Sequence, residues 1–385
     1  MVKRKMTKLL IHADVIADNA REQVENTAKS PALQGLIAIM PDVHFGAGSV
    51  IGFTGKFKDA VIPNIVGVDI GCGVSCYELG KIDIDFSELD KYIRKSIPLG
   101  MNRRKTNTEV CGFIESETVE RMFILEKRMT LSCPIENIIE PWLQYGTLGG
   151  GNHFIEIDQN SKGERFLIIH SGSRNYGLKV ANHFQKLANK ICKDRGIETG
   201  KNLQYLPMED GGNDYMKYLY ISQEFAKLNR EVMCKIILGH FNIEFSKENY
   251  IESVHNFISR KDNIIRKGAI SAHKGEKVII PLNMAEGCII GTGKGIPEYN
   301  FSAPHGAGRI FGRKEMGRKL DNPEDKDITM DAFKNSMDGV FSTCIHESTI
   351  DESPFAYKKY ESIEKHVKET IDIEDILKPI YNLKG

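Results

Sequence analysis

Six short runs of β-type residues limit most strongly what this chain can fold into. They are VIGFTGKF (50–57), GVSCYEL (73–79), HFIEID (153–158), RFLIIH (165–170), KVIIPL (277–282) and CIIGTG (288–293). Their length and their content of branched and aromatic residues are typical of strands. We therefore expect sheets assembled from segments that are far apart in the chain.

Helical periodicity separates these runs. It is clearest at 176–195, where one face carries Val180, Phe184, Leu187, Ala188 and Ile191. Further helices are expected near 85–97, 115–130, 214–236 and 356–370. Strands and helices are mixed without steady βαβ alternation, which favours a complex α+β fold over a doubly wound sheet.

Composition narrows the class of protein. The chain of 385 residues is 41% apolar and 27% charged, as in globular proteins. Lys and Arg together number 52, as do Asp and Glu, so a nucleic-acid partner requires a local basic patch. The eight cysteines form no CxxC pair, and the sequence has no signal peptide and no apolar stretch of membrane-spanning length. We expect a cytoplasmic protein with reduced thiols that are free to act as ligands.

Glycine-rich segments at the ends of the β-type runs carry the chemically active residues. The segment GVDIGCG (67–73) holds Asp69 and Cys72. Five others each hold one His: PDVHFGAG (41–48), GTLGGGNHF (146–154), IIHSGSRNYG (168–177), VHNF (254–257) and FSAPHGAGR (301–309). A single His beside Gly is most often a hydrogen-bonded turn or core residue. Five of them in similar settings indicate a shared site.

The residue types in these segments suit a metal site. Transition metals favour imidazole, thiolate and carboxylate ligands, and one thiolate can bridge two ions. The candidate ligands for a two-metal site are Asp69, Cys72, His153, His170 and His255. Arg174 in HSGSR offers a guanidinium fork that suits a phosphate. There is no P-loop, and GTGKG (291–295) does not fit GxGxxG, so a nucleotide would be held in another way.

Taken together, these motifs resemble the RtcB family of GTP-dependent RNA ligases, in order from about residue 40 to the last residue. The resemblance implies a complex α+β fold in one domain over residues 1–385, with a deep metal-containing cleft. It also implies an enzyme that joins an RNA 3′-phosphate or 2′,3′-cyclic phosphate to a 5′-hydroxyl with GTP and Mn²⁺. The setting is RNA repair or tRNA splicing.

The resemblance assigns roles to individual residues. Asp69, Cys72 and His153 bind one Mn²⁺, and Cys72, His170 and His255 bind the second. His305 is the nucleophile that takes GMP from GTP, and Asp42 is our candidate for the carboxylate that orients it. The implied nucleotide contacts are Asn152, His153, Phe154, Ile155, Glu156, His255, Asn256, Pro281, Leu282, Asn283, Met284, Cys288, His305, Gly306, Ala307, Gly308, Tyr357 and Lys384.

The chain departs from the commoner family pattern at the nucleotide. Many members read PGSMG where this chain reads PLNMA (281–285), and Cys288 stands where a Ser is usual. This variant resembles a shorter subgroup associated with RNA repair. Strict selectivity for GTP, the physiological RNA, the oligomeric state and any accessory protein are therefore left open by the sequence.

Two other functions are compatible with part of this pattern. A two-metal phosphoesterase could use the same ligands to activate water, but it needs neither His305 nor Lys384. A non-catalytic RNA-binding module would be expected to lose some ligands, and all are present. Basic residues do cluster at 260–267 and 309–319, which gives modest support for an RNA groove.

Overall fold

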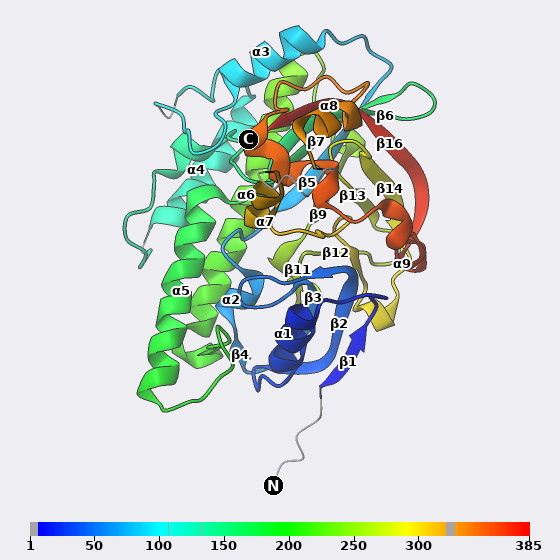
Figure 1. The fold of residues 1–385 in the computed structure, drawn as a ribbon. Coiled ribbons are helices and arrows are strands. Elements are labelled where there is room, and N and C mark those ends of the chain that lie inside the picture. The colour runs from blue at the N-terminus through cyan, green and yellow to red at the C-terminus, as the bar shows by residue number, and fades with distance from the viewer. Residues whose placement is uncertain (1–6, 107, 132, 321–327) are drawn as a thin grey trace.

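The computed structural model describes residues 7–106, 108–131, 133–320 and 328–385, and sheets of seven and five strands frame this part of the chain (Figure 1). The larger sheet has the order β13-β14-β16-β6-β7-β5-β9, and the smaller one has the order β1-β2-β3-β11-β10. Neighbouring strands pair antiparallel except for β1 and β2. The fold is therefore mixed α and β without doubly wound topology, as predicted.

The strands of the larger sheet are β5 (Gly73–Gly80), β6 (Phe154–Gln159), β7 (Arg165–Ser171), β9 (Tyr250–Val254), β13 (Lys277–Pro281), β14 (Cys288–Gly293) and β16 (Ile371–Lys384). Those of the smaller sheet are β1 (Lys8–Ile11), β2 (Leu33–His44), β3 (Ile51–Phe57), β10 (Asn256–Ile258) and β11 (Ile264–Lys267). Two further pairs are formed by β12 (Ala269–Ser271) with β15 (Ser302–Pro304) and β4 (Ala60–Val61) with β8 (Leu206–Pro207).

Helices pack on both of these sheets. Their bounds are α1 (Asp18–Ala28), α2 (Pro63–Val66), α3 (Phe86–Ser96), α4 (Ser116–Thr130), α5 (Arg174–Asp194), α6 (Asn213–His240), α7 (Arg313–Leu320), α8 (Met330–Ser336) and α9 (Glu364–Thr370). Helix α6 is largely buried and packs on β7 and β5, with α4 and α5 beside it. No helix of the described residues is both long and apolar enough to cross a membrane.

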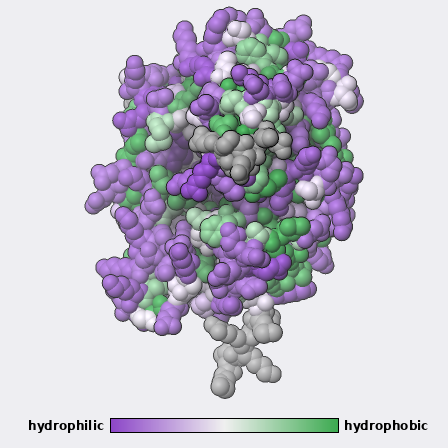
Figure 2. All heavy atoms as spheres, in the orientation of Figure 1, coloured by the Kyte–Doolittle hydropathy of each residue, from purple (hydrophilic) through white to green (hydrophobic). Residues whose placement is uncertain are grey.

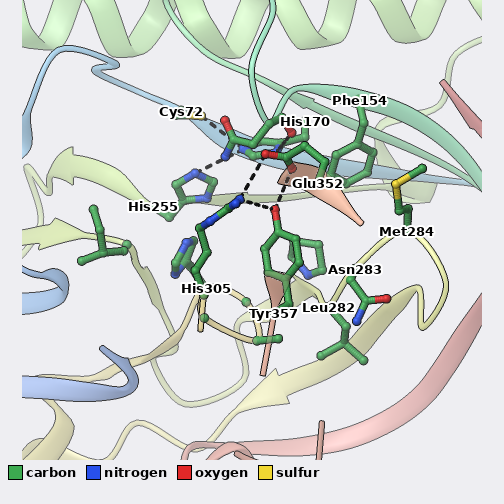
Figure 3. Close-up of a pocket in the computed structure, with 18 of the residues that line it drawn as sticks. Cys72, Phe154, His170, His255, Leu282, Asn283, Met284, His305, Glu352 and Tyr357 are labelled. Carbon is green, nitrogen blue, oxygen red and sulfur yellow. Dashed lines mark hydrogen bonds and ion pairs between the residues drawn. The ribbon is translucent and has the colours of Figure 1, made fainter. Parts of the chain in front are cut away.

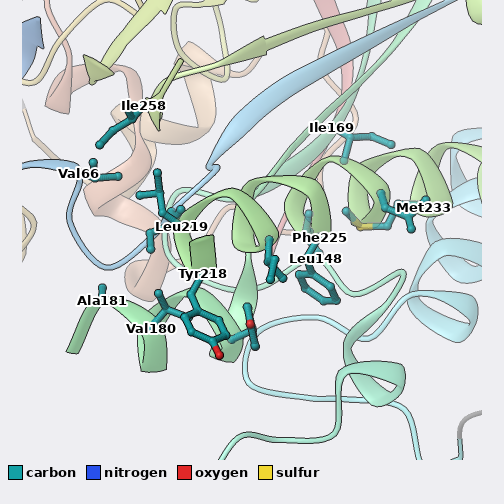
Figure 4. Close-up of a cluster of buried hydrophobic side chains, with 14 of the residues drawn as sticks. Val66, Leu148, Ile169, Val180, Ala181, Tyr218, Leu219, Phe225, Met233 and Ile258 are labelled. Atoms are coloured by element: carbon teal, nitrogen blue, oxygen red, sulfur yellow. The ribbon is translucent and has the colours of Figure 1, made fainter. Parts of the chain in front are cut away.

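The apolar core that holds these layers together lies between α5, α6 and the larger sheet (Figure 4). Val180 of α5 and Phe225 of α6 are both fully buried there. Truncation of a buried Phe to Ala typically lowers the free energy of unfolding by about 3–5 kcal/mol. Packing in this layer therefore contributes strongly to the stability of the sheet that carries the site. The face shown in Figure 2 is mostly hydrophilic, with apolar residues in scattered patches.

All six predicted strands are present, and four of the five predicted helices match α3, α4, α5 and α6. The fifth, predicted at 356–370, was wrong in its first half, because α9 begins only at Glu364. The backbone N–H of Lys358 donates to the carbonyl of Gly308, and the Tyr357 hydroxyl donates to Glu352. Tyr357 itself is extended and pairs with Arg309 in an isolated antiparallel β-bridge, which excludes a helix through this residue. The long strands β2 and β16 were missed; β16 carries an irregularity near Pro379, which disguises its pattern.

Candidate active site

The Gly-rich segments meet in a cavity of about 320 Å³ (Figure 3). It lies where the ends of β5, β6, β7 and β9 face the segment after β15 and the loop after β13. Of the predicted site residues, those that line it are Asp69, Cys72, Asn152, Phe154, Glu156, His170, His255, Asn256, Pro281, Leu282, Asn283, Met284, His305, Gly306, Ala307, Gly308, Tyr357 and Lys384.

Three predicted nucleotide contacts are not part of this lining: His153, which belongs to the Cys72 cluster described below, Ile155 and Cys288. Ile155 is fully buried in the main core, because successive side chains of a strand point to opposite faces and Phe154 and Glu156 take the cavity face. Cys288 is fully buried behind the cavity wall. The side chains of Ile155 and Cys288 therefore do not face this cavity.

The five candidate metal ligands converge at the inner end of the cavity. The Cys72 sulfur lies 3.5 Å from Nε2 of His153 and 3.2 Å from Nε2 of His170. Nε2 of His170 is in turn 3.4 Å from Nε2 of His255, and Nε2 of His153 is 3.1 Å from Oδ2 of Asp69. Residues separated by up to 186 positions in the chain therefore present their donor atoms to one small volume.

Backbone carbonyls determine which nitrogen of two of these histidines faces the cluster. Nδ1 of His153 is 3.0 Å from the Leu148 carbonyl, and Nδ1 of His170 is 3.0 Å from the Asn152 carbonyl. A carbonyl only accepts, so each Nδ1 carries the proton and each Nε2 keeps its lone pair. A second partner of this kind is characteristic of metal-binding histidines.

Burial sets the charge state of the cluster. It lowers the pKa of His170 and of His255 well below the usual value, and it raises the pKa of the Cys72 thiol. Burial would also raise the pKa of Asp69, but the close contact with the His153 imidazole outweighs burial and lowers that pKa to about 2. Neutral imidazoles, one carboxylate and a thiol that ionises when a cation compensates its burial fit a transition metal.

Arg230 of α6 fixes the two backbone segments that carry Cys72 and His170. Its fully buried guanidinium donates from Nη1 to the carbonyls of Gly71, at 2.8 Å, and Ser171, at 2.6 Å. Its other nitrogens bond to Glu252 of β9. The sequence analysis missed Arg230, because a single Arg within a long helix carries no local signal.

His305 lies beside this cluster and is oriented by Asp42 of β2. Nδ1 of His305 is 2.6 Å from Oδ2 of Asp42, and the backbone N–H of His305 donates to the same oxygen at 3.2 Å. The His305 ring is 4.9 Å from that of His255, centroid to centroid. Gly308 allows the close approach: its φ is +80°, and a Cβ there would lie 2.6 Å from the Asp42 carbonyl oxygen.

Arg174 lies next to the cluster at the start of α5. Its Nε donates to the Thr147 hydroxyl at 3.1 Å, and its Nη2 donates to the Gly100 carbonyl at 2.7 Å. Burial lowers the pKa of Arg174, and the opposing effects of Asp69 and Cys72 compensate only in part. The side chain thus connects two loops beside the candidate metal ligands, and it is not part of the cavity lining described above.

Glu352 ties the outer wall of the cavity together (Figure 3). Its Oε2 accepts from the Tyr357 hydroxyl at 2.6 Å and from Lys384 at 3.2 Å. Its Oε1 lies 2.7 Å from Arg313 and 3.2 Å from Arg309. Burial would raise the pKa of Glu352, but Lys384 and the two arginines lower it. Glu352 was not predicted from the sequence, because three of its four partners, Lys384, Arg309 and Arg313, come from distant segments.

Other residues of the cavity lining were not predicted either, among them Asn382 and His44. Asn382 could have been predicted from the sequence, because it lies two residues before Lys384 and therefore on the same face of a strand. His44 was noted as one of the five histidines but received no role. It lines the cavity, and its Nδ1 is 2.9 Å from the Asp42 carbonyl.

Two of the four basic residues in the cluster at 260–267 are buried. Arg266 is fully buried and bonds to Ser302 and Asp262. Lys267 is 4% exposed, and its amine donates to the backbone carbonyls of Ala47 and Asn64. Half of this cluster therefore stabilises the fold and does not face a ligand.

Comparison with known proteins agrees with this geometry. The family model described as "tRNA-splicing ligase RtcB" matches residues 23–385. The chain is 31% identical to the RNA-splicing ligase RtcB of Escherichia coli K12, over 95% of this chain and 94% of that protein. The chain belongs to the RtcB family. RtcB proteins of archaea are also similar, such as the tRNA-splicing ligase RtcB of Archaeoglobus fulgidus, which is 26% identical over 89% of this chain and 86% of its own length. The family resemblance noted in the sequence is thereby confirmed.

Proposed function

We propose that this RtcB-family protein is a GTP- and Mn²⁺-dependent RNA ligase that acts in RNA repair or splicing. Its substrates are RNA ends with a 3′-phosphate or 2′,3′-cyclic phosphate and ends with a 5′-hydroxyl. The observation that carries the proposal is the 2.6 Å contact between Asp42 and His305 in a cavity that also holds the Cys72 cluster. A hydrolase would need no such oriented imidazole.

Two Mn²⁺ ions are assigned to the cluster by the family pattern. Asp69, Cys72 and His153 would hold one ion, and Cys72, His170 and His255 the other. The convergence of these donor atoms and the lone pairs on Nε2 support this arrangement. When bound, such ions neutralise phosphate charge and stabilise the charge that develops during transfer.

His305 performs the first transfer in this proposal. Because Nδ1 keeps its hydrogen toward Asp42, the Nε2 lone pair is free to attack the α-phosphorus of GTP. The N–P bond forms as the P–O bond to pyrophosphate breaks, and Asp42 stabilises the positive charge that builds on the ring. An RNA 3′-phosphate oxygen then displaces His305 from phosphorus, and a 5′-hydroxyl finally displaces GMP. A cyclic phosphate is opened by water beforehand.

The nucleotide is assigned to the rest of the cavity. Asn152, Glu156 and Asn256 offer polar contacts, while Tyr357 and Lys384 are held at the rim by Glu352. We also propose that residues 1–385 form one catalytic domain. In support of this, the C-terminal strand β16 pairs with β14 and β6 in the interior of the larger sheet.

The test is covalent labelling. Protein incubated with Mn²⁺ and GTP labelled at the α-phosphorus should form an acid-labile adduct that maps to His305. His305→Ala should bind Mn²⁺ and GTP, form no adduct and still seal RNA that already carries a guanylylated 3′ end. His346→Ala, at an exposed histidine outside the cavity, is the matched control and should label normally.

Other outcomes would contradict the proposal. Label on Lys274, Lys294 or Lys384 would indicate a lysine-based nucleotidyl transferase. Absence of any adduct on the wild type, combined with release of phosphate from RNA ends, would indicate the two-metal phosphoesterase instead.

A further inference from the structure

Two buried carboxyl groups that are not among the candidate metal ligands lie at the wall of the cavity. Glu156 and Asp158 lie two apart on β6 and so share one face of the sheet, opposite Cys288 of β14. One oxygen of each carboxyl and the Cys288 sulfur all lie within 4.8 Å of one another. Glu156 is 2% exposed, and Asp158 and Cys288 are fully buried. Of the three, Glu156 is the one that lines the cavity.

The surroundings of the two carboxyl groups differ. Glu156 accepts a hydrogen bond from Nδ2 of Asn382 at 2.5 Å, and the Lys384 amine lowers its pKa. Neither oxygen of Asp158 receives a hydrogen bond from any donor among the described residues that meets normal geometry. The groups that face Asp158 are Glu156 and the thiols of Cys288 and Cys76. The groups that stabilise a negative charge, the Asn382 amide and the Lys384 amine, therefore act on Glu156 and not on Asp158.

Two carboxyl groups within 4.8 Å of each other in a buried site disfavour simultaneous ionisation, because each charge raises the free energy of the other. Burial raises the pKa of both groups, and Glu156 raises that of Asp158 further. Since Asn382 and Lys384 stabilise charge on Glu156, the shared proton belongs on Asp158. A protonated carboxyl is a hydrogen-bond donor, and Glu156 is the acceptor beside it.

We infer that Asp158 is a positioning residue for nucleotide selectivity: in its neutral form it donates to Glu156 and keeps that carboxyl ionised toward the cavity. The inference rests on the proposed guanine-nucleotide function. An ionised carboxylate only accepts, which matches the N1–H and N2–H donors of guanine. A neutral carboxylic acid has one donor and one acceptor, which matches N1 and the N6 amino group of adenine. The position of one proton thus decides which purine the wall of the cavity fits.

Two substitutions of similar size at Asp158 distinguish the effect of its hydrogen-bond donor from the effect of its side-chain volume. In Asp158→Asn the side-chain amide still donates to Glu156, so the ratio of kcat/KM for adduct formation with GTP over ATP should stay close to the wild-type value. In Asp158→Leu the donor is lost and burial drives the proton onto Glu156. Loss of a hydrogen bond to a charged group should lower the ratio by roughly tenfold or more. Asp83→Leu, at a fully exposed carboxylate, is the control.

An infrared measurement tests the proton itself and does not depend on whether the Leu variant folds. The wild type at neutral pH should show the C=O band of a protonated carboxyl group, and Asp158→Asn should lack it. Absence of that difference would overturn the inference. So would a loss of one bound Mn²⁺ in Asp158→Asn, because the cluster would then be a cation site.

The failure of this inference is distinguishable from that of the proposed function. If the wild type forms an adduct preferentially with GTP but Asp158→Leu leaves the ratio unchanged, the inference alone is wrong. If the wild type forms no adduct with either nucleotide, the proposed function fails and the role in selectivity fails with it.

Discussion

Asp42→Asn tests the orientation of the proposed nucleophile with little change in shape. In the wild type, Oδ2 of Asp42 accepts from both Nδ1 and the backbone N–H of His305. An Asn that keeps both bonds must turn its amide oxygen toward His305. Its NH₂ group then replaces Oδ1, which is buried and has no hydrogen-bond partner among the described residues.

Either orientation of that Asn weakens the nucleophile. With the oxygen toward His305, the charge that stabilises the developing imidazolium is lost, and a buried NH₂ is left unsatisfied. With the NH₂ toward His305, Nδ1 must accept, so the proton moves to Nε2 and blocks the attacking lone pair. A hydrogen bond to a charged group contributes roughly 1.5–3 kcal/mol, which corresponds to a rate of adduct formation slower by roughly 10- to 150-fold.

The assay is single-turnover labelling with GTP at saturating Mn²⁺, which isolates the first transfer from RNA binding. His305→Ala sets the background, and metal content and the melting temperature show whether Asp42→Asn is folded. A folded Asp42→Asn that labels as fast as the wild type would refute the orienting role of Asp42. Slow labelling that is matched by equally slow sealing of pre-activated RNA would also refute it, because that last step does not use the imidazole as nucleophile.

Three other outcomes are expected. Cys72→Ser should lose most of its bound Mn²⁺ and its ligation activity while its circular dichroism is unchanged, because a hydroxyl neutralises neither ion; two tightly bound Mn²⁺ in this variant would contradict a bridging thiolate. RNA joining should weaken as the salt concentration rises. Arg174→Ala should reduce joining far more than Arg260→Ala, because the guanidinium of Arg260 stacks on Tyr220 outside the cavity. Equal losses in the two variants would argue against a special role for Arg174. Burial lowers the pKa of His44 to about 4. Between pH 6.5 and pH 4 the unfolded state therefore binds more protons than the folded state, and His44 lowers the stability of the protein as the pH falls through that window. The stability of His44→Gln, measured by urea unfolding, should depend less on pH in this window than that of the wild type.

The sequence by itself determined the local features. Strand-like runs, the helix at 176–195 and the Gly-rich segments with Asp69, Cys72 and the histidines are set by short-range patterns of side-chain size and backbone freedom. Such patterns can be recognised without knowing what each segment packs against. Family membership can also be recognised from the sequence, because each of the family's motifs is a continuous segment of the chain.

Only the tertiary structure decided how these segments are held and which face each residue presents. Arg230 fixes the segments of Cys72 and His170 from α6, and Glu352 joins the wall of the cavity from a loop that carries no motif. Ile155 and Cys288 were expected at the nucleotide but lie behind the wall. Burial, hydrogen-bond partners and charge state depend on contacts between segments that are hundreds of residues apart, and no local pattern records these contacts.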